Sequence, residues 1–196
     1  MFFFCAEDCF YVLTIHLNED FRFEELIPRT VEFFRGEMLR HGYCKPIWVD
    51  DMMSGPNLGG CMASPSDKLR LQLLMEGDES ALEWYWREQA RLLVKKSVVA
   101  FASGVEKVFV STSVDWPSYF LPIWRFQGLI SSNGALKPVF YSYRLLVSEL
   151  NDFTSVEKIE LENASIYKFE TPSKDVYVAW SEKPGKIDLS KYVASP

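Results

Sequence analysis

Two adjacent carboxylates are the first candidates for chemistry in this sequence, since Asp50 and Asp51 close the apolar run "KPIWVDD" at residues 45–51. Carboxylates act as general acids or bases, as nucleophiles, or as ligands of hard cations. Consecutive residues of a strand point to opposite faces, so we expect these two not to act as a pair on one substrate. Three interpretations stay open: a solvated strand end with a loop cap, a degenerate substrate site, and a divalent-metal site completed by His16.

The elements that position these residues follow a strand–helix alternation. Apolar, β-branched runs at 11–17, 45–49 and 107–113 are typical of buried parallel strands. Helices are expected from Pro28 to Gly42, from the "SALE" capping box at 80–83 to Gly104, and from Pro138 onward. The order predicts an α/β fold with a parallel sheet, whose carboxyl end carries the long loops 51–77 and 114–137.

The chain changes character after Asn151. The short alternating runs "SVEKIELEN", "SIYKFE" and "VYVAW" predict three strands, the last two joined by a "TPSKD" turn. The sequence therefore predicts an α/β domain over residues 1–152 and a small all-β segment over 153–196.

Composition excludes several classes of function. A formal net charge of −6 and a pI near 5.1 give no basic surface for nucleic acid or for an anionic membrane. Neither a signal peptide nor a membrane span is recognised, so a cytoplasmic location is the default expectation. The four cysteines form no CxxC pair and the two histidines complete no zinc-ligand spacing, so neither a cofactor nor a metal is predicted.

Three stretches together resemble the C-terminal half of a (β/α)8-barrel glycoside hydrolase, of the retaining clan that includes β-xylosidases, α-L-iduronidases and cellulase-like enzymes. "KPIWVDD" is similar to the seventh barrel strand, which ends in Thr-Glu with the nucleophile. "GVEKVFVSTSVDW" is similar to the eighth strand, and "GLISSNGALKPVFYSYRLL" to the following loop and last helix.

The resemblance implies a partial (β/α)8 barrel containing strand–helix units six to eight, with an accessory β segment. It places Asp51 at the position of the catalytic nucleophile, one methylene shorter than the family's Glu. His16, Asn18, Trp116 and Trp124 are then expected to contact the sugar. A lone His on a strand is more often a core group, however, and the tryptophans could equally cover the core. The family's acid/base Glu belongs to strands that precede this sequence.

The resulting expectation is a truncated and inactive relative of a retaining glycoside hydrolase. The alternative is a non-catalytic module that binds carbohydrate or protein through the aromatic-rich 114–126 loop. Three strand–helix units cannot close a barrel, so we also expect either self-association or a complementing chain to cover the open sheet.

Overall fold

The protein is described by a computed structural model that covers residues 10–18, 22–56, 64–116, 125–161, 164–181 and 183–186. Its internal contacts divide the chain into two compact units, residues 1–148 and 149–196. Each unit is considered by itself. The sequence-based boundary after residue 152 stays a prediction.

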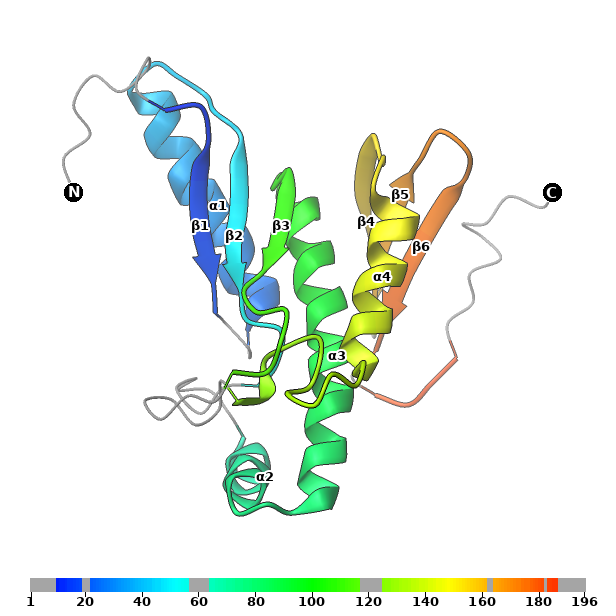
Figure 1. Cartoon of the computed structure of the whole chain (residues 1–196). Coiled ribbons are helices and arrows are strands. Elements are labelled where there is room, and N and C mark those ends of the chain that lie inside the picture. The colour runs from blue at the N-terminus through cyan, green and yellow to red at the C-terminus, as the bar shows by residue number, and fades with distance from the viewer. Residues whose placement is uncertain are drawn as a thin grey trace. The chain divides into compact units, whose positions relative to one another are not determined.

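The first unit is built on a three-stranded parallel sheet. Its strands are β1 (Leu13–Leu17), β2 (Ile47–Met52) and β3 (Lys107–Val110), in the order β1-β2-β3 (Figure 1). The helices are α1 (Phe23–Arg40), α2 (Pro65–Met75), α3 (Glu79–Ala102) and α4 (Pro138–Leu150), the last of which runs across the boundary between the units. The predicted parallel α/β arrangement is therefore confirmed.

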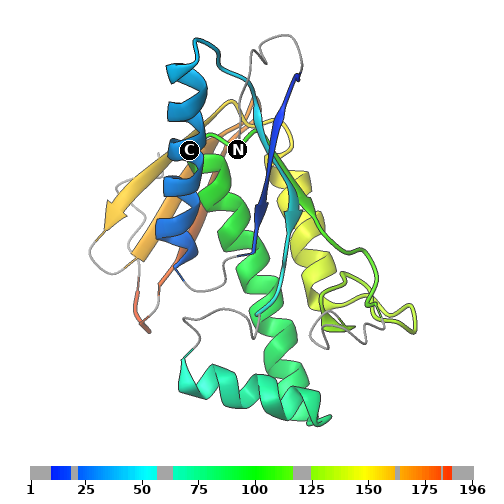
Figure 2. The ribbon, with the colours of Figure 1, turned by 90° about the vertical axis from the view of Figure 1, so that its left-hand side faces the viewer.

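One face of this sheet is apolar and covered, and the other is open. Ile15, Leu17, Ile47 and Val49 are buried, whereas His16 between the first two is exposed. Helix α1 lies along the covered face (Figure 2) and buries a stripe at helical spacing, made of Ile27, Val31 and Met38. Burial of this face fixes the direction in which the polar residues of β1 and β2 point.

Helix α1 begins five residues before the predicted start. Its first residue is Phe23, and Pro28 lies inside the helix, where it cannot donate the bond that the carbonyl of Glu24 would accept. Gly42 has φ +80° just after the helix, as predicted for a left-handed C-terminal residue.

The region between residues 51 and 77 is not a continuous loop, because helix α2 forms within it. Pro65 occupies the first turn and the Ser64 side chain accepts the Asp67 N–H as a cap. The following helix is capped by Asp78, which accepts the Ala81 N–H, and not by the predicted Ser80. A buried cluster joins α2 to α3, and its members are Leu71, Leu74, Ala81, Trp84 and Tyr85.

The second unit contains an antiparallel sheet in the order β4-β5-β6, with β4 at Ser155–Leu161, β5 at Ala164–Glu170 and β6 at Asp175–Trp180. Thr171 donates its N–H to the carbonyl of Lys174 and closes the predicted hairpin turn. The three predicted C-terminal strands are confirmed.

Within the described residues these strands make two open three-stranded sheets, and neither a closed barrel nor a sheet sandwich is present. No helix in the described part of the chain has the length and apolar character needed to cross a bilayer.

Candidate functional site

A cavity of about 360 Å³ lies at the carboxyl end of the parallel sheet. Asn18 follows β1, Asp51 belongs to β2, and Ser111 and Thr112 follow β3. Three further residues complete the described lining: Met53, Trp116 and Gln127. Ligands of parallel α/β proteins bind at this end of the sheet, so this cavity is the candidate site.

A β-bulge shapes the carboxylate side of the site. Ile15 is paired with Val49 and His16 with Asp51, so Asp50 is an extra residue with no partner on β1. His16 Nε2 lies 3.5 Å from Asp50 Oδ1, and His16 Nδ1 lies 3.6 Å from Asp51 Oδ2. The expectation that the two carboxylates point to opposite faces is therefore wrong, because the bulge breaks the alternation on which it relied.

These contacts leave the Asp51 carboxylate poorly satisfied. The distance from Asp51 Oδ2 to His16 Nδ1, like that from Asp50 Oδ1 to His16 Nε2, is longer than a normal hydrogen bond. Asp51 Oδ1 is buried and has no hydrogen-bond partner. About a third of the side chain, 36%, is exposed at the cavity. Because Oδ1 is covered, Oδ2 is the oxygen that is able to accept a donor from a ligand.

The three acidic and imidazole side chains do not form a metal site. The two ring nitrogens of His16 face different carboxylates, so the side chains do not converge on one centre. Among the described residues there is no group of three His, Cys, Asp or Glu side chains that could hold an ion. Within the part of the chain that the structure describes, the arrangement of Asp50, Asp51 and His16 does not support the metal interpretation.

The residues singled out from the sequence lie as follows. Asn18, Asp51 and Trp116 line the same cavity, and His16 contacts Asp51 beside it. Trp116 is 65% exposed, so part of it is accessible to a ligand. Trp124 lies outside the described residues. The roles assigned to these residues in substrate binding stay predictions.

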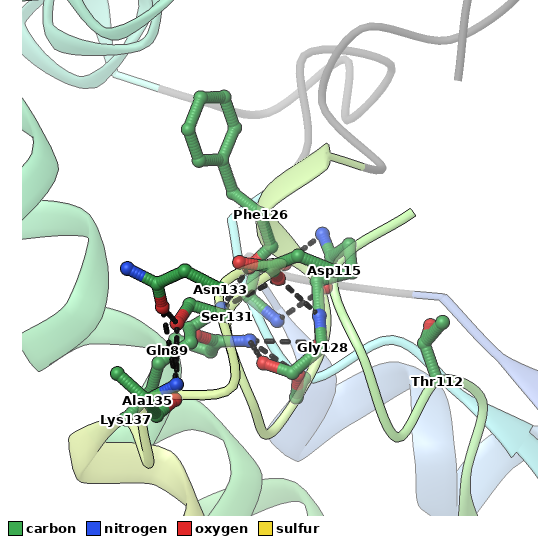
Figure 3. Close-up of polar contacts among 12 residues, drawn as sticks. Gln89, Thr112, Asp115, Phe126, Gly128, Ser131, Asn133, Ala135 and Lys137 are labelled. Atoms are coloured by element: carbon green, nitrogen blue, oxygen red, sulfur yellow. Dashed lines mark hydrogen bonds and ion pairs between the residues drawn. The ribbon is translucent and has the colours of Figure 1, made fainter. Parts of the chain in front are cut away.

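A buried amide network, which sequence reasoning missed, holds the wall of the cavity. Gln89 of α3 donates from Nε2 to Ser54 Oγ at 2.9 Å and to the Gln127 carbonyl at 2.9 Å. It also donates to the Gly128 carbonyl at 3.1 Å (Figure 3). Gly55 donates its N–H to Gln127 Oε1 at 2.9 Å. The network fastens the chain after β2 to the segment that carries Gln127.

A second buried group ties down the chain next to Trp116. Lys137 donates to Asp115 Oδ1 at 2.8 Å and to the Phe126 carbonyl at 2.7 Å, and the Gly128 N–H donates to the same Asp115 oxygen at 2.8 Å. The two charged side chains are only 2% and 10% exposed. Burial raises the pKa of Asp115, against the opposing effect of Lys137, and burial lowers the pKa of Lys137.

Gly128 fits this group because it has no side chain. A Cβ there would lie 2.2 Å from the Asp115 nitrogen and 2.3 Å from the Val114 carbonyl carbon. Lys96 is fully buried and donates to the carbonyl of Met53, a lining residue, at 2.7 Å. Both ends of the cavity lining are thus held by buried contacts.

The fold and the position of the cavity define a class of protein, namely α/β proteins whose parallel β–α units carry a site at the carboxyl ends of the strands. Solved structures agree with this class. A family 39 glycoside hydrolase from the gut symbiont Bacteroides cellulosilyticus WH2 is similar in structure, with a TM-score of 0.53 and 15% sequence identity. The similarity covers 80% of this chain and 27% of that chain.

This likeness relates the fold to that of a glycoside hydrolase, and the chain spans about a quarter of the length of the hydrolase. No protein-family model and no curated protein matches the sequence.

Proposed function

We propose that this chain is a relative of the retaining glycoside hydrolases that binds a carbohydrate in the cavity and does not hydrolyse it by itself. The observation that carries the proposal is the meeting of Asn18, Asp51 and Trp116 around one cavity at the strand ends. A carboxylate, an amide and an exposed indole are groups that accept, donate and stack against a sugar.

Retaining hydrolysis needs two carboxyl groups about 5–5.5 Å apart on opposite sides of the scissile bond. Asp51 is the only ionisable side chain among the described lining residues. Asp50 contacts the other nitrogen of His16 and does not belong to this lining. The described cavity therefore supplies one carboxylate, which supports binding without turnover.

The length of the Asp51 side chain supports the same conclusion. Its carboxylate is withdrawn by one methylene from where a Glu would place it. A misplacement of about 1 Å can reduce a rate ~100-fold, so Asp51 is a poor nucleophile even where an acid/base partner is supplied.

The test has a binding arm and a hydrolysis arm. Short oligosaccharides are titrated against the chain by calorimetry or tryptophan fluorescence, and aryl β-glycosides and aryl α-L-iduronides are assayed for hydrolysis. We expect binding that Trp116→Ala weakens about tenfold, since one aromatic contact contributes about 0.5–1.5 kcal/mol beyond the area it buries. We expect no turnover by the wild-type chain or by Asp51→Glu.

Two outcomes contradict the proposal in different ways. Robust hydrolysis by the isolated wild-type chain would show that the chain is an active enzyme. Absence of binding to every sugar would leave the alternative, a protein-binding or assembly module.

A specific observation favours that alternative. The open face of the parallel sheet carries Trp48 and Phe109, whose ring centroids are 6.1 Å apart, and Phe109 is 45% exposed. Such a face can receive a second copy or a complementing chain. Light scattering tests self-association, and a monomer at micromolar concentration would count against it.

A further inference from the structure

We propose that the cavity selects a sugar that carries a free ammonium group, a hexosamine, over neutral, N-acetylated and uronic acid sugars. This inference rests on the proposed function and names the substrate class of the same site. It follows from the charge of the cavity and from the unsatisfied state of Asp51.

The described lining of the cavity is acidic. Asp51 is its only ionisable residue, and Asp50 lies on the same strand beside it. Lys or Arg side chains are absent from the described lining. Two basic residues lie two positions from the lining along the chain: Arg125 has its guanidinium 5.4 Å from the centroid of the Phe126 ring, and His16 has Nδ1 3.6 Å from Asp51 Oδ2. A uronate would therefore meet the Asp51 carboxylate and no Lys or Arg side chain of the described lining.

The chain segments that adjoin the lining in sequence carry no compensating cation either. Residues 19–21, 57–63 and 117–124 contain no Lys or Arg. Lys96 is fully buried with its ammonium on the Met53 carbonyl, so a ligand in the cavity cannot contact it. Lys137 is paired with Asp115.

The Asp51 carboxylate lacks a donor of normal length. The chain covers Oδ1, so a ligand would contact Oδ2, which lies 3.6 Å from the His16 ring nitrogen. An ammonium brings three donors and a positive charge, and such charge-assisted bonds are roughly twice as strong as neutral ones. A sugar hydroxyl provides only the neutral bond, and an acetamide removes the charge.

The remainder of the lining suits a sugar ring rather than a bare cation. Met53 and the exposed Trp116 ring form an apolar wall, and Asn18, Ser111 and Thr112 provide hydrogen-bonding groups. A volume of about 360 Å³ lies at the small end of the range of ligand pockets, which favours a mono- or disaccharide.

The experiment compares four disaccharides by calorimetry on the full chain: the β-1,4 dimer of glucosamine, its N,N′-diacetyl form, cellobiose, and a disaccharide that contains a uronic acid. The pH is held below the pKa of the sugar amine. We expect the free-amine dimer to bind at least about tenfold tighter than the diacetyl form, because charge-assisted hydrogen bonds are roughly twice as strong as neutral ones. The uronic acid sugar should bind weakest.

Variants distinguish a direct contact between the ammonium group and Asp51 from a long-range attraction to the negative charge of the strand end. Asp51→Asn should bring the ratio between the free-amine and diacetyl forms close to one. The matched control, Asp50→Asn, removes a neighbouring carboxylate outside the described lining and should keep the ratio within about threefold of wild type. Trp116→Ala should weaken all four sugars and preserve the ratio. Thermal unfolding verifies that each variant is folded.

The outcomes that overturn the inference differ from those that overturn the proposed function. Equal affinity for free-amine, N-acetylated and uronic acid sugars would refute the selection and leave carbohydrate binding intact. An effect of Asp50→Asn as large as that of Asp51→Asn would refute the contact. Ethylammonium binding as tightly as the glucosamine dimer would show a cation site without sugar recognition. Failure of every sugar to bind would remove the proposed function itself.

Discussion

The two sheets differ in how completely their charged side chains are paired with hydrogen-bonding or ionic partners. In the antiparallel sheet, Lys168 contacts both Glu170 and Asp175, and Ser155 donates to Glu170. In the parallel sheet, Asp51 has one oxygen without a partner and another at 3.6 Å from an imidazole. Charges that satisfy one another serve the fold, whereas a charge left unsatisfied beside a cavity is available to a ligand.

The pKa shifts express the same contrast. The hydrogen bonds that Lys168 donates to Asp175 and Glu170 raise the pKa of Lys168, and the Ser155 hydroxyl is the main cause of the lowered pKa of Glu170, so both groups favour their charged forms. Near the cavity, burial acts in the opposite direction on Asp115 and Lys137 and disfavours their charged forms. The parallel-sheet unit therefore depends on buried pairing that the second sheet does not need.

The largest change in stability that tests this contrast is expected when the buried ammonium group of Lys137 is removed. Lys137→Met leaves Asp115 buried without its ion-pair partner, and we expect the free energy of unfolding to fall by about 3–5 kcal/mol. The matched control is Lys168→Met in the second sheet, where solvent screens the ion pairs and we expect a much smaller loss. Urea denaturation of both variants measures the difference, and equal losses would contradict the contrast.

The loss caused by Lys137→Met should shrink as the pH falls. Burial already raises the folded-state pKa of Asp115 above its ordinary value of 3.8, and removal of Lys137 raises it further. As the pH falls through that raised value, the folded carboxyl takes up a proton before the unfolded one, so protonation favours the folded state. Denaturation curves at a series of pH values should show a smaller difference from wild type at acid pH, and a constant difference would exclude the buried carboxylate as its cause.

A smaller loss of stability is expected where the backbone of Gly128 approaches that of Val114 and Asp115. Gly128→Ala places a Cβ 2.2 Å from the Asp115 nitrogen, so the backbone must move, at about 1–3 kcal/mol of stability. Gly36→Ala is the control, because a Cβ at that position in α1 meets nothing within 4 Å. It should raise stability by about 0.5–1 kcal/mol. Thermal melts distinguish the opposite signs.

The smallest effect is expected at the candidate site itself. Asp51→Asn should change the free energy of unfolding by less than about 1 kcal/mol, since its contact with His16 is exposed and long. A loss above about 2 kcal/mol in chemical denaturation would indicate that Asp51 stabilises the fold, and would weaken its assignment to ligand binding.

Sequence patterns predicted the elements that depend on local chemistry. The buried parallel strands followed from continuous apolar runs and the last three strands from alternation. Helix α2 was missed although Ser64, Pro65 and Asp67 carry its start signal, because the nearby glycines and prolines were interpreted as a continuous loop. The position of Pro28 was also misjudged, since tertiary packing of Phe23 and Ile27 extends the helix ahead of it.

The parts of the site that escaped prediction depend on distant residues. Gln89 reaches partners 35 to 39 positions away in the chain, and no local pattern indicates such bonds. The bulge at Asp50 depends on how β2 pairs with β1, which a single strand does not reveal. The sequence therefore indicated a carboxylate at the strand end, where Asp51 lines the cavity, but it assigned the Asp50 side chain to the wrong face of the strand.

The bulge at Asp50 also determines how many carboxylates β2 presents on its open face. The buried residues of β2 are Ile47, Val49 and Met52, so the strand changes the parity of its faces at the two carboxylates. Deletion of Asp50 would restore an even alternation, with one acid on the open face and Met52 still toward the helices. A gain or loss of one codon can thus switch the strand between one carboxylate and two without rebuilding the core.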